Sequence, residues 1–172
     1  MQLVSPSPLY KDSFLESVKG IVADGNVHFL RTAIDENNFQ KYCDTLIGYK
    51  HGIGLPEEYV NETVLWLLDG NEHIGNLSLR HELTEHLLKI GGHIGYIIAP
   101  KHRGKGYGTK ILALGLKEAA KLGMEKVLVT CDKTNTASAK IIEKNGGVLE
   151  NEVADENNGW KKRYWIENRI VK

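Results

Sequence analysis

The sequence predicts an α/β fold in which a mixed central sheet of about seven strands is flanked by about four helices. Two patterns predict this class: short apolar runs typical of buried strands, and segments with apolar residues at the three- and four-residue spacing of helices. Turns rich in glycine and asparagine separate them. The chain has 172 residues, of which 41% are hydrophobic, so it can bury one continuous core. Because we find no repeat and no linker, we expect a single domain over residues 1–172.

The N-terminal part predicts one short strand and two helices. Leu3-Val4 begins the strand, and the apolar residues between 14 and 22 follow the spacing of an amphipathic helix. We expect Asp35 to be the N-cap of the second helix, because its side chain can accept a hydrogen bond from a free backbone N–H and an apolar face follows at residues 39–47. Both helices therefore precede most of the sheet.

A β-hairpin is predicted next. Residues 63–68 are an apolar run of strand length, and the Asp69-Gly70-Asn71 turn after them is a strong hairpin signal that leads into a partner strand at residues 74–79. Residues 80–89 permit either one helical turn or a loop. A further strand over residues 93–99 is ended by the proline that follows it.

The remaining chain alternates helix and strand and ends in a second hairpin. We expect these elements at residues 106–122, 126–131, 135–144, 148–153 and 160–167. The strand, helix and strand up to residue 131 predict a right-handed crossover between parallel neighbours. The last two strands are expected to connect through Asn157-Asn158-Gly159.

Composition gives little support to several functional classes. No stretch reaches the ~20 apolar residues of a membrane-spanning helix, and the start lacks the basic-then-apolar order of a secretory signal, so we expect a cytoplasmic protein without a membrane partner. Cys43 and Cys131 have no partner at metal-ligand spacing and are expected to be reduced thiols. No His-x-x-x-His pair carries a glutamate, so we expect no metal.

The charge is unevenly distributed although the formal net charge is zero. Residues 1–90 hold 7 Lys and Arg against 13 Asp and Glu, and residues 91–172 hold 15 against 9, which gives −6 and +6. Summed fields attract opposite charge into clefts, so this split favours an anionic ligand on the second half and a cationic one near the first. An uneven solvated surface explains it equally well.

The segment with most chemical content is the glycine-rich loop at residues 99–109, between a predicted strand and a predicted helix. Three alternate glycines, Gly104, Gly106 and Gly108, allow positive φ and let backbone N–H groups approach a ligand beside a helix N-terminus. Three nearby cations would add to that field: Lys101, Arg103 and Lys105. The loop therefore predicts a phosphate site. A basic surface loop is the simpler alternative, and a nucleic-acid partner is not expected because stacking aromatic residues are missing.

Two common phosphate loops do not fit this segment. A P-loop needs Gly-Lys-Ser/Thr, whereas the order here is Gly108-Thr109-Lys110. A dinucleotide fold needs Gly-x-Gly-x-x-Gly near its first strand, whereas these glycines alternate and come late in the chain.

The pattern Arg103-x-x-Gly106-x-Gly108 after a strand ending in proline resembles the signature loop of the GCN5-related N-acetyltransferases (the GNAT family), which use acetyl-coenzyme A (acetyl-CoA). The predicted order of elements also matches that family over nearly the whole chain. The resemblance implies that the pyrophosphate is held by the backbone amides of Arg103, Gly104, Lys105, Gly106, Tyr107, Gly108 and Thr109. It further implies that Ile97 and Ile98 contact the pantetheine.

Two more positions match the family's coenzyme site. Asn135 stands where family members have an asparagine that reaches the pantetheine arm, and Ser138 occupies the next-turn position. Asparagine is also an excellent N-cap, so Asn135 has a structural explanation as well, and both roles are compatible.

The catalytic residues are less well defined by the resemblance. Family members often place a glutamate near the start of the strand before the loop, where this chain has His93, whose neutral imidazole can accept a proton directly or through water. A polar residue at a strand end is the alternative. Many members carry a tyrosine that protonates the leaving thiolate, but Ile142 occupies that position, so the general acid is not identified. Cys131 and Tyr164 could substitute for it, but packing in the core or lining the cleft is the simpler explanation of both.

The resemblance predicts transfer of the acetyl group of acetyl-CoA to a primary amine in a ternary complex, without a metal. The acceptor is a small-molecule or peptide amine that the sequence does not name, and a homodimer is compatible with the family. Acidic residues could attract a cationic amine: Glu57, Glu58, Glu62, Glu82 and Glu85. The alternative function is a catalytically silent acetyl-CoA sensor, since the usual tyrosine is absent.

Overall fold

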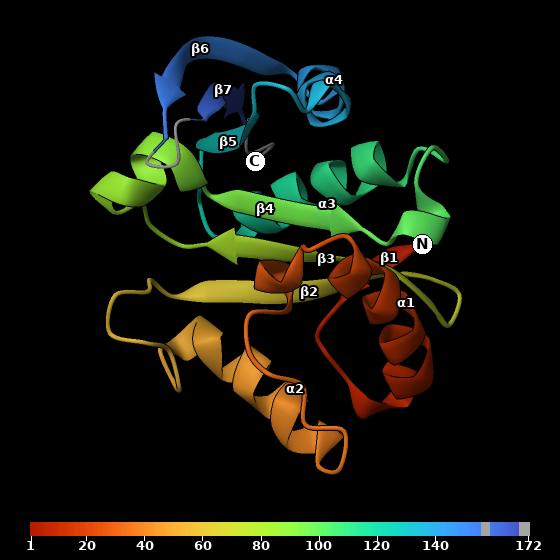
Figure 1. The fold of residues 1–172 in the computed structure, drawn as a ribbon. Coiled ribbons are helices and arrows are strands. Elements are labelled where there is room, and N and C mark those ends of the chain that lie inside the picture. Colours follow the sequence, from red (N-terminus) through yellow and green to blue (C-terminus); the bar gives the residue numbers. More distant parts are fainter. Residues whose placement is uncertain (156–158, 169–172) are drawn as a thin grey trace.

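The computed structural model describes residues 1–155 and 159–168. Their seven strands form two antiparallel sheets (Figure 1). The first sheet has the order β1 (Gln2–Val4), β2 (Glu62–Asp69), β3 (Glu72–Arg80) and β4 (Ile94–Ile98). The second has the order β5 (Lys126–Asp132), β7 (Trp160–Glu167) and β6 (Gly147–Ala154). The α/β class is confirmed.

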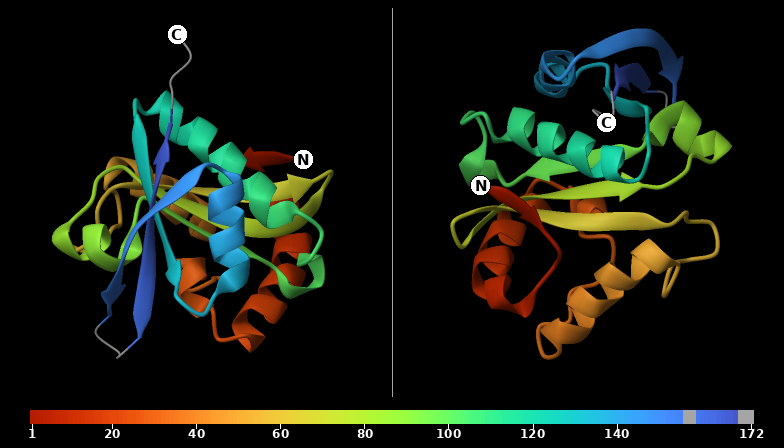
Figure 2. Two further views of the ribbon diagram at one scale, coloured as in Figure 1. Left: turned by 90° about the horizontal axis from the view of Figure 1, so that it is seen from above. Right: turned by 180° about the vertical axis from the view of Figure 1, so that it is seen from behind.

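Helices cover both faces of the first sheet because β2 alternates two apolar sets. Val64 and Trp66 face α1 (Lys11–Ala23) and α2 (Phe39–Gly48), while Leu65 and Leu67 belong to the core beneath α3 (Tyr107–Lys121). Figure 2 shows α3 on the face opposite α1 and α2, and α4 (Thr136–Lys144) beside the second sheet. Short 3₁₀ turns complete the described elements: Pro8–Tyr10, Val27–Leu30, Tyr49–His51 and Pro100–His102.

The two sheets meet at His93 and Leu128. The His93 N–H donates to the carbonyl of Leu128 at 2.8 Å, and the Leu128 N–H donates to the ring Nδ1 of His93 at 2.9 Å. The ring nitrogen thus satisfies the Leu128 N–H in place of a backbone carbonyl, and β4 and β5 are not paired in one sheet. The prediction of one mixed sheet with β4 and β5 as paired parallel neighbours is therefore wrong in this detail.

One local prediction also needs correction. The N-cap of α2 is Asn38, whose Oδ1 accepts from the Lys41 N–H at 3.2 Å, while Asp35 caps the preceding turn. Residues Leu87–Gly91, where a helical turn or loop was expected, form a π-helical turn. The predicted turn at 157–159 lies mostly outside the described residues. Within residues 1–155 and 159–168, no helix combines the length and hydropathy needed to cross a bilayer.

Candidate functional site

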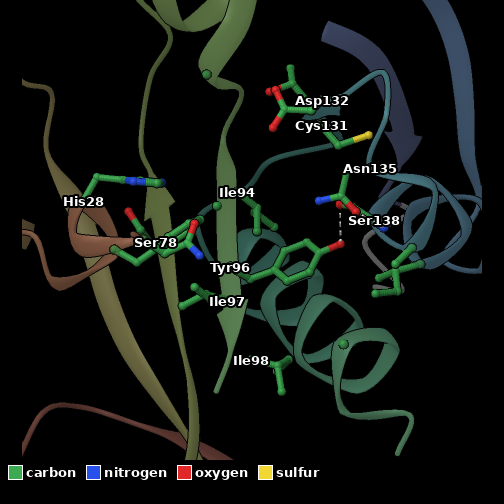
Figure 3. A pocket seen from close by; sticks show the side chains of 18 of the residues that line it. His28, Ser78, Ile94, Tyr96, Ile97, Ile98, Cys131, Asp132, Asn135 and Ser138 are labelled. Atoms are coloured by element: carbon green, nitrogen blue, oxygen red, sulfur yellow. Dashed lines mark hydrogen bonds between the residues drawn. The ribbon is translucent and has the colours of Figure 1, made fainter. Parts of the chain in front are cut away.

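A cleft of about 690 Å³ runs along β4 between the two sheets (Figure 3). One wall carries His28 and Ser78, and the other carries Cys131, Asp132, Asn135 and Ser138, with Tyr96 projecting between them. The cleft brings together eight of the predicted cofactor-binding residues: Ile97, Ile98, Arg103, Gly104, Tyr107, Gly108, Asn135 and Ser138. Four of the predicted site residues are not part of its lining: His93, Lys105, Gly106 and Thr109.

The floor of the cleft is a free strand edge. The Ala99 N–H donates to the carbonyl of Ile74, and in an antiparallel ladder only alternate residues face the partner strand. The N–H groups of Tyr96 and Ile98 therefore face away from β3, toward the cleft. The carbonyl of Ile98 faces the same way and accepts from Arg103 Nε at 3.0 Å. An extended ligand with amide groups can hydrogen-bond to such an edge.

The glycine loop lies at one end of this edge, directly before α3. Gly104 and Gly106 have φ of +75° and +83°, and a Cβ on either would meet no atom within 4 Å. Gly106 is the N-cap of α3 and supplies no capping side chain, so the first amides of the helix remain available. A Cβ on Gly108, in contrast, would lie 2.5 Å from Ile141 Cδ1, so Gly108 lets α3 approach α4. These features fit a bound phosphate group.

The cations of the loop have mostly internal partners. Lys101 contacts Glu16 at 2.8 Å and Glu72 at 3.2 Å, and Arg103 contacts Asp24 at 2.6 Å. Part of the charge difference between the two halves is thus neutralised by contacts between them. An anion at this loop would consequently be held by backbone amides and the α3 N-terminus more than by basic side chains.

Tyr96 connects β4 with α4 across the cleft. Its hydroxyl lies 3.0 Å from Ser138 Oγ, and the Ser138 N–H donates to Asn135 Oδ1 at 3.0 Å (Figure 3). Asn135 is therefore the N-cap of α4 and also lines the cleft, so both of its predicted roles are compatible with its position. Burial raises the pKa of Tyr96 to about 12, so its hydroxyl keeps its proton at neutral pH. Sequence analysis did not select Tyr96, although a tyrosine within an apolar strand was a usable signal.

His93 is positioned to join the sheets, and its catalytic role stays a prediction. Burial lowers its pKa to about 4, so the ring is neutral, and Nδ1 accepts from Leu128, which leaves the proton on Nε2. Accepting another proton would require giving up that hydrogen bond. Ile142 is fully buried in the core. Tyr164 is also buried and donates to Glu143, whereas Cys131 lines the cleft with its pKa raised by burial.

The opposite wall contains polar residues that sequence analysis did not identify as a group. Arg31 Nε donates to Glu62 Oε1 at 2.5 Å, and Ser78 donates to the other oxygen of this buried carboxylate. The two Nη1 hydrogen bonds of Arg80 go to backbone carbonyls, those of Gly91 at 3.1 Å and Gly92 at 3.0 Å.

A second cavity of about 630 Å³ adjoins the first at Arg31 and Arg80. Its other lining residues are Glu58, Tyr59, Val60, Glu62, Thr84, Glu85, His86 and Leu87. Predicted acidic residues thus lie at this outer cavity, although Glu62 is already paired with Arg31. Among the described residues, no group of three potential metal-binding side chains occurs.

The fold and the cleft define an α/β protein in which a glycine loop and a helix N-terminus lie at one end of a free strand edge. The family described as "Acetyltransferase (GNAT) domain" matches residues 15–148. The chain therefore belongs to the GNAT acetyltransferases, and it is an acyl-CoA-dependent N-acetyltransferase.

Solved structures agree with this assignment at the level of fold. An acetyltransferase from Salmonella typhimurium that modifies the N-terminal serine of a 50S ribosomal subunit protein is 18% identical, with a TM-score of 0.64 over 99% of this chain and 94% of that one. The spermidine/spermine N-acetyltransferase SpeG from Vibrio cholerae is 18% identical, with a TM-score of 0.63 over 97% and 94%. A microcin self-immunity acetyltransferase, MccE, solved with acetyl-CoA and AMP, is 16% identical, with a TM-score of 0.62 over 96% and 91%. A search of curated protein sequences finds no match.

Proposed function

We propose that the protein transfers the acetyl group of acetyl-CoA to a primary amine by direct transfer in a ternary complex. The observation that carries this proposal is the continuity of two cavities. A cleft with a phosphate site at one end adjoins a second cavity at Arg31 and Arg80, so a donor and an acceptor have separate spaces that meet. Donor and acceptor can therefore bind at the same time.

The chain's own residues would hold the coenzyme in three ways. The amides of residues 104–109 would bind the pyrophosphate, the free edge of β4 would bind the pantetheine amides, and Asn135 and Ser138 would contact the same arm from α4. When bound, acetyl-CoA supplies an acetyl group activated as a thioester. The N–H groups of Tyr96 and Ile98 are the donors available to polarise a carbonyl at this edge.

A neutral amine is needed, because alkylammonium groups have a pKa of about 10.4 and carry no lone pair. We propose a histidine as the proton acceptor, and the chain offers two. His93 is the residue predicted from the sequence. His28 lines the cleft, neither ring nitrogen has a hydrogen-bond partner among the described residues, and burial with nearby Arg31 lowers its pKa. Both rings are neutral at pH 7, but only His28 faces the cleft.

We further propose that Tyr96 takes the place of the absent family tyrosine. Its protonated hydroxyl lies in the cleft beside Ser138 and can donate a hydrogen bond to a departing thiolate. A thiol pKa near ~8.5 means that the thiolate gains a proton at neutral pH. Of the three protons of the acceptor ammonium, one therefore stays on the amide nitrogen, one ends on sulfur, and one reaches solvent through the base. Ile142 can donate no proton.

Coenzyme binding and thiol release test the function. Calorimetry with acetyl-CoA and CoA measures binding, and release of free thiol across an amine panel measures turnover. Two structural neighbours act on a protein N-terminal serine and on spermidine/spermine, so a serine-initiated peptide and spermidine are the first acceptors to try. Thiol release above hydrolysis with one amine supports transfer, whereas coenzyme binding without turnover on every amine supports the sensor alternative. A cytoplasmic location, a homodimer and the lack of nucleic-acid or membrane partners stay predictions.

A further inference from the structure

Arg80 is unusual among the lysine and arginine side chains that line the cleft. Three others each contact a carboxylate: Arg31 with Glu62, Arg103 with Asp24, and Lys161 with Asp132. Arg80 has no carboxylate within ion-pair distance among residues 1–155 and 159–168. It is therefore the one guanidinium of the described lining whose charge is left without a direct counterion.

The Arg80 side chain is held in place without being neutralised. Its Nη1 donates to the carbonyls of Gly91 and Gly92, which fix the guanidinium but carry no net charge. The residue is only partly exposed, and burial lowers its pKa, although an arginine stays charged at physiological pH. A desolvated, oriented cation is costly unless an anion completes its environment.

The position of this cation excludes the coenzyme phosphates as its partner. A Cβ on Gly95 would lie 3.8 Å from both Nη1 and Nη2, so the guanidinium lies over the first part of β4. The phosphate site follows the other end of that strand. Three residues of strand separate Gly95 from Ile98, or roughly 10 Å, and the glycine loop lies further on. Arg80 instead borders the outer cavity, on the acceptor's side.

We propose that the amine acceptor also carries a carboxylate and that Arg80 binds it. The proposal rests on acetyl transfer as the function of the site. A guanidinium whose Nη1 is already engaged still offers Nη2 and Nε, which suit a single carboxylate. A phosphate dianion fits less well, because Glu58 and Glu85 line the adjoining cavity and would repel a second negative charge. Glu62, the buried carboxylate of the outer cavity, is occupied by Arg31 and Ser78.

Matched acceptors that differ only in the carboxylate test this inference. The glycyl-alanine dipeptide and its amide probe a peptide C-terminus, and a serine-initiated tripeptide amide with Asp or Asn at its second position probes a side chain. We expect kcat/KM to be at least about tenfold higher for the acid of one pair, equivalent to about 1.4 kcal/mol. Arg80→Gln should bring that ratio to about 1, and Arg80→Lys should restore part of it.

Arg163 provides the matched control for this substitution. It donates to the Leu88 carbonyl of the same π-helical turn at 2.9 Å, contacts Glu150, and is not part of the cleft lining. Arg163→Gln should therefore leave the acid-to-amide ratio unchanged. If Arg80 only stabilises this turn, Arg80→Gln will lower activity on the acid and the amide equally, and the proposal is overturned.

A binding measurement makes the result independent of turnover. Calorimetry with the N-acetylated dipeptide acid and its amide, with and without CoA, should show about tenfold tighter binding of the acid and no preference in Arg80→Gln. Equal affinity of the acid and the amide, or turnover restricted to spermidine, overturns the proposal. Coenzyme affinity is measured separately, so a failure of the acetyltransferase assignment appears there and not in the acid-to-amide ratio.

Discussion

Replacement of Gly106 by valine tests the phosphate site most directly. Gly106 has φ +83° and immediately precedes α3, and a Cβ there would point into space that contains no protein atom within 4 Å. An L-residue in this conformation costs about 1–2 kcal/mol of folding free energy. The added side chain would either occupy the concavity or, by relieving the strain, turn the loop amides away from it.

The expected loss of coenzyme affinity follows from the amides involved. A hydrogen bond to a charged group is worth about 1.5–3 kcal/mol, so the loss of one amide contact to pyrophosphate should raise the Kd for CoA by about 10- to 100-fold. Calorimetry measures the Kd, and thermal unfolding measures the strain. Gly108→Val is a poorer probe, because its Cβ would collide with Ile141 and loosen the packing of α3 on α4.

Gly123 provides the control. It lies at the opposite end of α3 with φ +78° and open space around its Cβ position, so Gly123→Val should cause comparable strain without touching the cleft. We expect similar stability losses in the two variants and an affinity loss only for Gly106→Val. Unchanged affinity in Gly106→Val, or an equal loss in Gly123→Val, would refute the assignment of residues 104–109 to pyrophosphate binding.

Four further predictions concern the polar side chains around β4. His93→Ala should lower the free energy of unfolding by about 1–3 kcal/mol, because the buried Leu128 N–H loses its acceptor. His93→Asn places Oδ1 near the position of Nδ1, so it should lower the free energy of unfolding by less. If His93 is also the base, both variants lose turnover. The wild-type protein should lose stability as the pH falls from about 6.5 to 4, because His93 binds a proton more tightly in the unfolded state than in the folded state. Chemical denaturation at several pH values measures this loss, which should be smaller in His93→Asn. Tyr96→Phe should lower kcat about tenfold with unchanged CoA affinity, and an unaltered kcat would dismiss its proposed role. His28→Gln should remove an ionisation below pH 6.5 from the pH profile of kcat/KM, and an unchanged profile would leave His93 as the candidate base.

Much of the fold was predictable because local patterns determine it. Strand β7 was predicted with its observed bounds, and most other elements within a few residues. This succeeds because the apolar residues at alternating or helical spacing are the ones that the fold buries. The break between the sheets was not predictable in this way. It depends on the ring of His93 taking a backbone partner that lies 35 positions away.

The candidate site was predicted on one wall only. Asn135, Ser138 and the glycine loop follow one another in a short segment with a recognisable order. The opposite wall of the cleft brings Arg31 and Ser78 together through Glu62, to which both donate hydrogen bonds. These residues lie far apart in the sequence, so no local spacing marks them. The ion pairs of Lys101 and Arg103 could likewise not be predicted, because the carboxylates that they contact lie far away in the sequence.

The free edge of β4 also bears on self-association. Unpaired N–H and C=O groups on an edge strand offer a template on which another chain can add a strand. Here that edge is recessed between two walls and ends at the Arg103 guanidinium, which already occupies the Ile98 carbonyl. A thin, flexible molecule can enter and satisfy these groups, while a neighbouring polypeptide with its own flanking side chains is kept out.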